Sequence, residues 1–331
     1  MLTVVLCSVG CRVELARHFV DSVRKLAPSG SRVVGLDLDA MAPALQFVDV
    51  PLVVPRVGTT EFAEVIRSLA DVQGGDTVLF VPLSDREIEQ LASLSAELSR
   101  PEVRFAVVSA DAVPVVNDKW QTMKFFESLG LATPRSWIPD VGLDEVTFPA
   151  FIKPREGSAG HGASAVRDRF ELNRCVADID RPIVQQLLTG DEVTTDLVCD
   201  LSGGFVAAVS RRRIHVRGGE VMKAVTMVSD EIEHACRRIA AALPAIGPIT
   251  VQAFEQSDGS FVFSEINARL GGGSPLAIAA GVPITDVMVI DALGRRTQHE
   301  FGYVPNLYMT RHDESVFVTG DDLDELRSRR L

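Results

Sequence analysis

The sequence "FVFSEINARLGGGSP" (Phe261–Pro275) begins as an apolar strand and becomes polar halfway along. Alternate side chains of a β-strand point to one face, so Phe261, Phe263, Glu265, Asn267 and Arg269 are expected on the same side. Mg²⁺ accepts carboxylate and amide oxygens together with substrate phosphates, and an arginine beyond them can bind a phosphate. A solvated strand end would explain one such residue. Three in register, followed by "LGGGSP", indicate a metal and phosphate site.

The preceding segment "ITVQAFE" (249–255) is predicted to be the partner strand. The turn sequence "SDGS" (257–260) joins the two segments as a hairpin. This pairing brings Gln252 or Glu255 beside Glu265, where either could complete the metal site. We favour Gln252, although the hairpin geometry does not separate the two.

Composition restricts the kinds of partner. The chain has 331 residues, enough for two or three domains or lobes, and its formal net charge of −12 argues against nucleic acid and anionic membranes as partners. No apolar segment approaches the ~20 residues that cross a bilayer. The five cysteines are an odd number without a C-x-x-C pair, which is typical of reduced thiols. We therefore expect a cytoplasmic protein without nucleic-acid or membrane partners.

The first hundred residues repeat a pattern of strand followed by helix. The strand-like segments "TVVLCSVG", "RVVGLDLD", "TVLFVPL" and "RFAVVS" alternate with the helical patterns "RVELARHFVDSVRKLA" and "DREIEQLASLSAEL". This alternation predicts a parallel, doubly wound sheet. Such sheets often bind NAD, but the first turn offers only Gly10 in place of G-x-G-x-x-G, although Asp37 lies where a ribose-binding acid is expected. The simpler interpretation is a tight turn at Gly10 and a strand end at Asp37.

The pattern changes near Pro114. The segment "VVNDKWQTMKFFESLGLATP" (115–134) is predicted to be a helix with Asn117 or Asp118 as its N-cap and Gly130 at its end. Short strands and one helix follow, and long strands begin near Gly190. We therefore predict a doubly wound domain over residues 1–114, a small α+β lobe over 115–189 and a larger lobe over 190–331.

A glycine-rich loop follows a lysine in "KPREGSAGHG" (153–162). Gly157, Gly160 and Gly162 lack a Cβ, so their backbone N–H groups could approach phosphates closely. Lys153 precedes the glycines, so the Walker A pattern is not met. A flexible turn would explain the glycines equally well if Lys153 were absent. His161 is expected to be an exposed turn residue.

The motifs and their order resemble the ATP-grasp superfamily, nearest to the branch of the carbamoyl-phosphate synthase large chain. The resemblance rests on "VNDKWQTMKFFESLGLATP", "FPAFIKPREGSAGHG", "IVQQLLTGDEVTTD" and "TVQAFE…FVFSEINARLGGG", and "PLSDREIEQLA" resembles an acidic element of relatives. It implies a mixed α/β and α+β fold. In that fold an N-terminal parallel, doubly wound preATP-grasp domain precedes a two-lobed ATP-grasp fold.

The resemblance also implies roles for single residues. The residues implied to contact ATP are Lys119, Lys153, Gly157, Ser158, Gly160, Gly162, the backbone of Gln186, Leu187 and Leu188, and Glu192 at the ribose hydroxyls. The residues implied to bind magnesium are Gln252, Glu265 and Asn267, with Arg269 beside the transferred phosphoryl group. The sequence departs from the family pattern at Gln185 and Gln186, where glutamate is commoner, and at His161.

A basic strand is predicted in "SRRRIHVRGGEVMKAVTM" (210–227). Arg211, Arg213, His215 and Arg217 would share one face of it. In an acidic protein this face suggests an anionic second substrate, with Arg213 and Lys223 as the preferred contacts. An edge strand protected by charge against association is nearly as good an explanation. The "GGGSP" segment could present backbone N–H groups to a carboxylate, or could be a plain turn.

The implied function is ATP-dependent ligation of a small-molecule carboxylate to an amine through an acyl phosphate. The cofactors are ATP and Mg²⁺, as two ions that Mn²⁺ could replace, and the catalytic residues are Arg269, Lys223 and Arg213. Phosphorylation of a small acid such as carbamate, without ligation, is an alternative, as is a nucleotide-binding sensor without turnover. An NAD-dependent enzyme ranks third. The sequence names neither substrate and leaves open whether the chain forms a homodimer.

Overall fold

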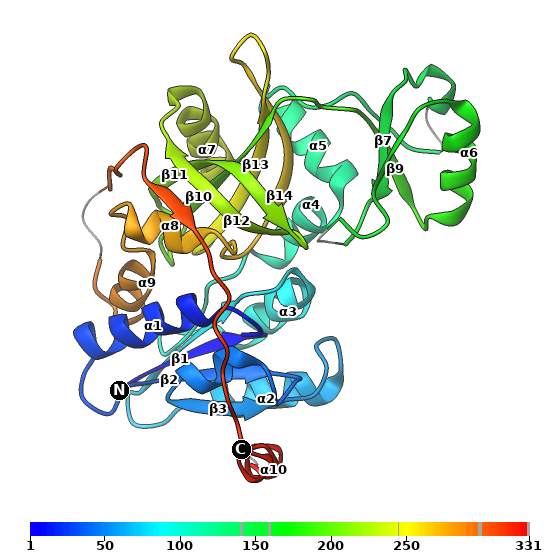
Figure 1. Cartoon of the computed structure of the whole chain (residues 1–331). Coiled ribbons are helices and arrows are strands. Elements are labelled where there is room, and N and C mark those ends of the chain that lie inside the picture. The colour runs from blue at the N-terminus through cyan, green and yellow to red at the C-terminus, as the bar shows by residue number, and fades with distance from the viewer. Residues whose placement is uncertain (140–141, 158–159, 244, 297–299, 330–331) are drawn as a thin grey trace.

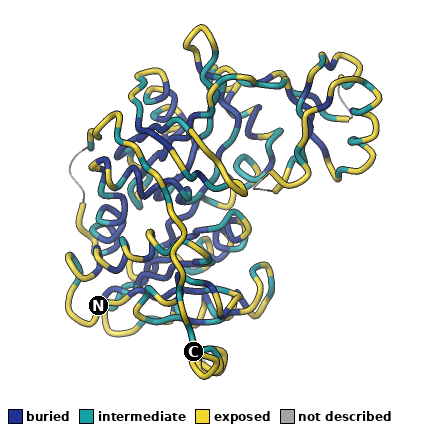
Figure 2. Tube along the Cα trace, viewed as in Figure 1, coloured by how far each residue is buried: buried dark blue, intermediate teal, exposed yellow. Residues whose placement is uncertain are grey.

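The computed structural model describes residues 1–139, 142–157, 160–243, 245–296 and 300–329. These residues form a five-stranded, a four-stranded and a six-stranded sheet (Figure 1). Figure 2 shows that buried segments concentrate in the five- and six-stranded sheets and the helices against them. No helix in these ranges is long and apolar enough to span a bilayer.

The N-terminal domain is built around the five-stranded parallel sheet, with strand order β3-β2-β1-β4-β5. Val4 and Leu6 of the central strand face helix α1, whereas Val5 and Cys7 face helices α2 and α3. Helices thus cover both faces, which confirms the doubly wound fold expected from the alternation of strands and helices. The elements are β1 (Leu2–Cys7), α1 (Val13–Leu26), β2 (Arg32–Asp37), β3 (Val50–Val53), α2 (Thr60–Ala70), β4 (Thr77–Pro82), α3 (Ile88–Leu98) and β5 (Val103–Phe105).

Two elements of this domain were not among the segments expected. Strand β3 has four residues, one of which is Pro51, so it carries little strand signal. Helix α2 begins at an N-cap, Thr59, whose side chain accepts the N–H of Phe62. Asp37 accepts the backbone N–H groups of Gly10 at 2.7 Å and Asp39 at 2.9 Å. Its carboxylate therefore orders the loop after β1, which favours the simpler interpretation over ribose binding.

The small lobe contains the four-stranded sheet, with order β6-β9-β7-β8, and one covering helix. It has its own apolar cluster, which includes Trp137, Ile152 and Leu172. Figure 1 shows this lobe standing away from the rest of the molecule. Its elements are β6 (Ser136–Trp137), β7 (Ala150–Pro154), β8 (Ser164–Val166), α6 (Arg169–Asp178) and β9 (Pro182–Gln186).

The large lobe is organised by the six-stranded antiparallel sheet, with order β14-β13-β10-β11-β12-β15. The segment expected as one basic strand is a hairpin, β11 and β12, because the chain turns at Gly218 and Gly219, both of which have positive φ. Strand β11 lies between β10 and β12, so the edge-strand explanation is wrong. The elements are β10 (Asp191–Cys199), β11 (Phe205–Arg217), β12 (Glu220–Met227), α7 (Asp230–Ala242), β13 (Pro248–Glu255), β14 (Phe261–Asn267), α8 (Ser274–Ala279), α9 (Ile284–Ala292) and β15 (Tyr308–Thr310).

Helices α4 (Val113–Asn117) and α5 (Lys119–Ser128) pack on the large lobe, although the sequence suggested that residues from 115 onward belong to the small lobe. The ring of Phe126 lies 5.7 Å from that of Phe263 in β14. Of the two N-cap candidates, Asp118 caps α5 by accepting the N–H of Trp120. The last helix, α10 (Gly320–Ser328), returns to the N-terminal domain beside β3 (Figure 1).

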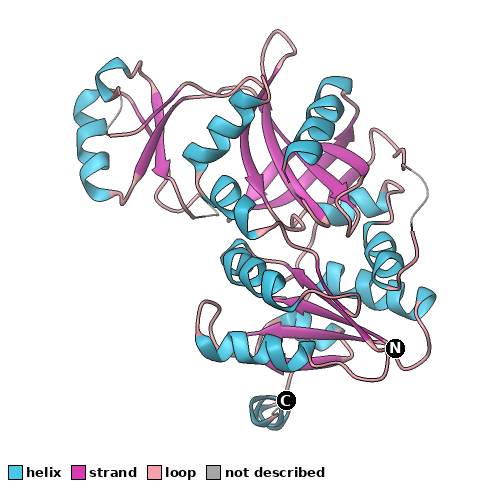
Figure 3. Cartoon of the chain, turned by 180° about the vertical axis from the view of Figure 1, so that it is seen from behind, coloured by secondary structure: helices cyan, strands magenta, loops and turns pink. Residues whose placement is uncertain are grey.

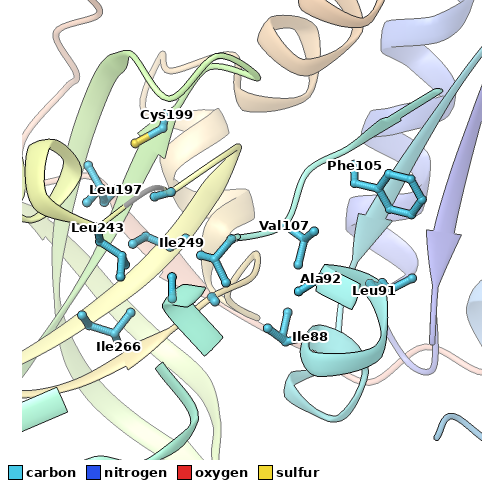
Figure 4. Packing of buried hydrophobic residues seen from close by; sticks show 14 of the residues in the cluster. Ile88, Leu91, Ala92, Phe105, Val107, Leu197, Cys199, Leu243, Ile249 and Ile266 are labelled. Carbon is cyan, nitrogen blue, oxygen red and sulfur yellow. The ribbon is translucent and has the colours of Figure 1, made fainter. Parts of the chain in front are cut away.

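One apolar cluster joins the N-terminal domain to the large lobe (Figure 4). Ile88 and Leu91 of α3 belong to it, and so do Leu197 of β10, Ile249 of β13 and Ile266 of β14. These side chains are at most 2% exposed. The two units therefore share a core across the boundary expected near residue 114, and this core sets the position of the N-terminal loops relative to the six-stranded sheet.

Glu87 is a buried acid whose titration should affect stability. Burial raises its pKa to about 7, although hydrogen bonds from Ser8, Ser84 and Leu83 oppose the rise. Between about pH 4.5 and 7 the folded state therefore holds a proton that the unfolded state has lost. Stability should fall across this window by up to about 3 kcal/mol.

We expect Glu87→Gln to remove this dependence, because the amide stays neutral and its oxygen can accept the same two N–H groups. Urea unfolding of both proteins at pH 5 and pH 7 measures the effect. An equal change in the free energy of unfolding for both proteins would contradict the assignment.

Arg211 and Asp196 form an ion pair that is almost completely buried, with side chains 2% and 1% exposed. Among the described residues, Arg211→Met would leave the hydroxyl of Ser274, at 2.8 Å, as the remaining side-chain donor to the Asp196 carboxylate. We expect a loss of about 3–5 kcal/mol in the free energy of unfolding. The double variant Arg211→Met/Asp196→Leu should recover most of this loss. Denaturant unfolding tests the pair, and a double variant as unstable as the single one would argue against an uncompensated charge as the cause.

Candidate active site

A cavity of about 590 Å³ lies between the small and large lobes. It is lined from one side by β7 and the loops beside it, and from the other by the polar ends of β10, β11, β13 and β14. The residues predicted from the sequence that line it are Lys119, Lys153, Gly157, Gly160, Gln186, Leu187, Leu188, Glu192, Arg213, Gln252, Glu265, Asn267 and Arg269. The fold thus brings most of the predicted site together.

A β-bulge in β14 separates its apolar part from its polar part. Gln252 pairs with Glu265 and the next residue, Ala253, pairs with Phe263, so Ser264 has no partner in the ladder. The extra residue shifts the alternation of side chains. Phe261 and Phe263 accordingly face the shared core. Glu265, Asn267 and Arg269 face the cavity. The expectation that all five side chains share one face is therefore wrong, because a regular strand was assumed.

The predicted metal residues lie on adjacent strands. Gln252 is directly opposite Glu265, and Asn267 is opposite Thr250. Glu255 does not line the cavity and forms an ion pair with Arg212 instead. Of the two candidates that hairpin geometry left open, only Gln252 reaches the cavity.

The oxygen atoms of these side chains fit a cation that is also coordinated by a bound small molecule. Among the described residues no group of three His, Cys, Asp or Glu side chains could hold a metal ion alone. One carboxylate and two amides would leave coordination positions for phosphate oxygens or water, as is usual for Mg²⁺. The residues present therefore fit Mg²⁺ bound together with a nucleotide.

Two lysines line the cavity near the glycine-rich loop. Lys153 lies in β7; burial lowers its pKa, while the nearby carboxylates Glu265 and Glu192 oppose that shift. Lys119, the first residue of α5, donates a hydrogen bond of 2.7 Å from Nζ to the carbonyl oxygen of Gly157. Lys119 thus holds one end of the glycine-rich loop in this conformation.

The glycine-rich loop needs its glycines for conformation. Gly157, Gly160 and Gly162 have φ values of 111°, 70° and 71°, which other residues rarely adopt. The first two line the cavity, as does His161, which is exposed as expected. Gly162 lies against Pro154 and lines a neighbouring hollow instead. The predicted Ser158 lies outside the described residues.

Part of the cavity lining is apolar. Phe151 from β7 and Phe254 from β13 line it together with Leu187 and Leu188, which follow β9. The backbone N–H of Gln186 donates to the carbonyl of Arg135 at 2.8 Å, so it is already engaged. Flat apolar walls with nearby backbone groups suit a heterocyclic ring.

Glu192 and Arg213 form the centre of a polar network in the cavity. Glu192 accepts hydrogen bonds from Arg213 Nη1 and, at 2.7 Å, from Gln252 Nε2. Arg213 also donates to the carbonyl of Gly219 at 3.2 Å. The expectation that Glu192 contacts a ribose stays a prediction, since this structure shows it bonded to protein groups.

Of the other two predicted catalytic residues, one lines the cavity and one does not. Arg269 lines the cavity and is held by Asp85 of the N-terminal domain, at 2.8 Å. Lys223 is exposed on β12 and lies outside the lining of this cavity. The basic face expected on β11 is not formed, because Arg211 is buried against Asp196 and the strand has irregular register beside His215. The contact between Asp85 and Arg269 was not predicted. The two residues are 184 positions apart, and no pattern around either of them indicates it.

Comparisons with known proteins support the similarity to ATP-grasp proteins. Residues 178–312 match a family model described as "ATP-grasp in the biosynthetic pathway with Ter operon", and residues 4–106 match one described as "PylC-like, N-terminal domain". The carbamoyl phosphate synthase large chain of Agathobacter rectalis is 25% identical over 203 residues, covering 57% of this chain and 19% of the relative. D-alanine–D-alanine ligase of Fusobacterium nucleatum is 22% identical over 170 residues, 48% of this chain and 58% of the relative. The chain therefore spans less than two thirds of either relative.

Solved structures show the same fold. The biotin carboxylase domain of 2-oxoglutarate carboxylase from Hydrogenobacter thermophilus, solved with MgADP, ADP and bicarbonate, has a TM-score of 0.73 at 16% identity. The match covers 92% of this chain and 73% of that one. One family model covers most of the N-terminal parallel sheet, and the other covers the six-stranded sheet. The observed fold, with the polar face of the β13–β14 hairpin, agrees with both matches. Residues 178–312 are thus similar to an ATP-grasp family, and the fold of the chain agrees with this similarity.

Proposed function

We propose that this chain is an ATP- and Mg²⁺-dependent carbon–nitrogen ligase that releases ADP and phosphate. One observation carries the proposal: Glu265, Asn267 and Arg269 face a cavity whose opposite wall holds Lys153. This is an arrangement for neutralising and aligning a triphosphate. The relatives named above include ligases that join carbon to nitrogen, which supports the reaction class.

The reaction has two steps. A carboxylate oxygen of the acid attacks the γ-phosphorus of ATP, the bond to the β–γ bridging oxygen breaks, and ADP leaves. The amine nitrogen then attacks the acyl carbon, the carbon–oxygen bond to phosphate breaks, and the leaving phosphate can take the proton that the amine loses. The products are an amide, ADP and phosphate.

The residues of the chain would divide this work by position. Gln252, Glu265 and Asn267 would hold magnesium, proposed as two ions that Mn²⁺ could replace, and the metal would neutralise charge on the phosphates. Lys153 and Arg269 would contact the phosphates from opposite walls. In this structure Lys119 donates a hydrogen bond to the carbonyl of Gly157. Once Lys119 moves from that carbonyl to a phosphate, the loop that contains Gly157 would exclude water from the acyl phosphate.

A screen of acid and amine pairs for Mg²⁺-dependent ADP release tests the function. Formation of amide distinguishes ligation from simple phosphorylation of the acid, which would leave free acyl phosphate. ATP binding without ADP release across the whole panel would indicate a sensor instead. The cysteines are not needed as nucleophiles; burial raises the pKa of Cys199 to about 12.

For the metal site, we expect Glu265→Gln to lower turnover roughly 100-fold or more, because charge stabilisation in the transition state is lost. It should also abolish the tightening of ATP binding by Mg²⁺, which equilibrium titration measures without turnover. Glu255→Gln is the matched control, since Glu255 is on the same hairpin but bonds to Arg212. If Glu255→Gln had the larger effect, the ligand assignment would be reversed.

For the nucleotide site, we expect Lys153→Ala to weaken ATP binding by roughly tenfold or more, because a desolvated ammonium beside the phosphates is removed. Lys124→Ala is the control, since Lys124 is half exposed on α5 and pairs with Glu127. Titration of each variant with ATP gives the dissociation constants. Unchanged affinity in Lys153→Ala would remove this residue from the site.

A further inference from the structure

A smaller cavity of about 80 Å³ adjoins the nucleotide cavity, and Gln252, Asn267 and Arg269 line both. Five buried side-chain atoms without a hydrogen-bond partner among the described residues belong to residues that line this smaller cavity: Arg12 Nη1, Thr194 Oγ1, Arg211 Nε, Arg213 Nε and Arg269 Nε. An unpaired buried polar group costs about 1–3 kcal/mol. The concentration of such atoms indicates a site for a ligand with acceptor oxygens.

The charges around this cavity determine what kind of ligand fits. Each of the four arginines already has an acidic partner: Arg12 has Glu220, Arg211 has Asp196, Arg213 has Glu192 and Arg269 has Asp85. The site therefore offers directed N–H donors with little surplus positive charge. Such a site suits a monoanion with two oxygens better than a phosphate dianion.

Arg12 is the donor that the N-terminal domain supplies. It is the N-cap residue of α1, its side chain is 16% exposed, and its Nη2 lies 3.1 Å from Glu220 Oε1 of β12. Its Nη1 packs against Gly272, where a Cβ would come within 2.5 Å of it and within 1.8 Å of Glu220 Oε2. Residue 272 must be glycine for this pair to lie where it does.

A second arginine keeps this arrangement in place. Arg311, which follows β15, lies 3.8 Å from Glu220 and donates a hydrogen bond to the carbonyl of Gly272. Glu220 is thus shared between two arginines, and Arg12 Nη1 has no hydrogen-bond partner among the described residues.

We propose that Arg12 is a binding residue for the acid substrate and that the smaller cavity holds the carboxylate of that acid. This inference rests on the proposed function. The carboxylate accepts hydrogen bonds from Arg12 Nη1 and from the Nε atoms of Arg211 and Arg213. The volume of about 80 Å³ is several times the roughly 10–15 Å³ that one water needs, which is room for a carboxylate head. Asn267 borders both cavities, so this carboxylate lies beside the phosphate end and takes up the phosphoryl group.

The test uses small anions as probes, without nucleotide. Sodium acetate and sodium bicarbonate, both labelled with ¹³C at the carboxyl or carbonate carbon, are each titrated into the whole chain at constant ionic strength, and binding is followed by the broadening of the ¹³C NMR signal. The variants are Arg12→Ala, Arg12→Lys and, as the matched control, Arg24→Ala, because Arg24 is an exposed arginine on the same helix. ATP binding in the presence of Mg²⁺ is measured separately on every variant.

We expect Arg12→Ala to weaken binding of the preferred anion by roughly tenfold or more, with Arg12→Lys intermediate, Arg24→Ala unchanged and ATP affinity equal in all. Preference for acetate indicates an organic acid, and preference for bicarbonate indicates a carbonate substrate. Equal binding by Arg12→Ala, or absence of binding of either anion by the unaltered chain, overturns the proposal. Failure of the unaltered chain to bind ATP would instead reject the proposed function.

A second variant addresses the cavity without removing its arginine. Gly272→Ala should displace the pair of Arg12 and Glu220 and weaken anion binding to a similar extent, while thermal unfolding reports whether the fold is kept. Wild-type anion affinity in a folded Gly272→Ala protein would count against the position assigned to Arg12.

Discussion

A single extra residue, Ser264 in β14, determines which side chains of this strand reach the cavity. Without the bulge, Glu265 would point to the same side as Phe263, into the apolar core shared with α3. A buried, unpaired carboxylate there would be strongly unfavourable. The bulge lets one continuous strand bury its first half and present Glu265, Asn267 and Arg269 to the cavity. Packing and site formation thus depend on one local irregularity.

The N-terminal domain is part of the site as well as of the core. The shared apolar cluster fixes α3 against the six-stranded sheet, and a second cluster joins Val9, in the loop after β1, with Val209 of β11. Figure 3 shows the N-terminal domain directly below the lobe that carries this sheet. Asp85 can therefore hold Arg269, and Arg12 can reach Glu220. Each charged group that approaches the smaller cavity is balanced by an oppositely charged partner from another strand or domain. The cavity in consequence presents oriented donors at low net charge.

Much of the fold could be predicted because it is encoded in local periodicity. Alternating strand and helix patterns predicted the doubly wound sheet, and the "SDGS" turn predicted that Gln252 or Glu255 would lie beside Glu265, of which Gln252 does. Errors arose where a local pattern was interrupted. Strand β3 is short and contains Pro51, and the glycine pair at 218–219 turned an expected single strand into the β11–β12 hairpin. Lys223 consequently lies on the second strand of that hairpin, outside the lining of both cavities.

The sequence by itself determined most of the order of elements, the superfamily to which it is similar, and the polar residues of β7 and β14 that line the larger cavity. Only the tertiary structure decided that Arg12 and Asp85 belong beside them, that Arg211 is a buried structural ion and that Glu255 is not at the site. Asp85 and Arg269 are 184 positions apart. Contacts at such separations leave no periodic trace in the chain, because they form only when the apolar faces of two domains pack together and bring unrelated loops into register.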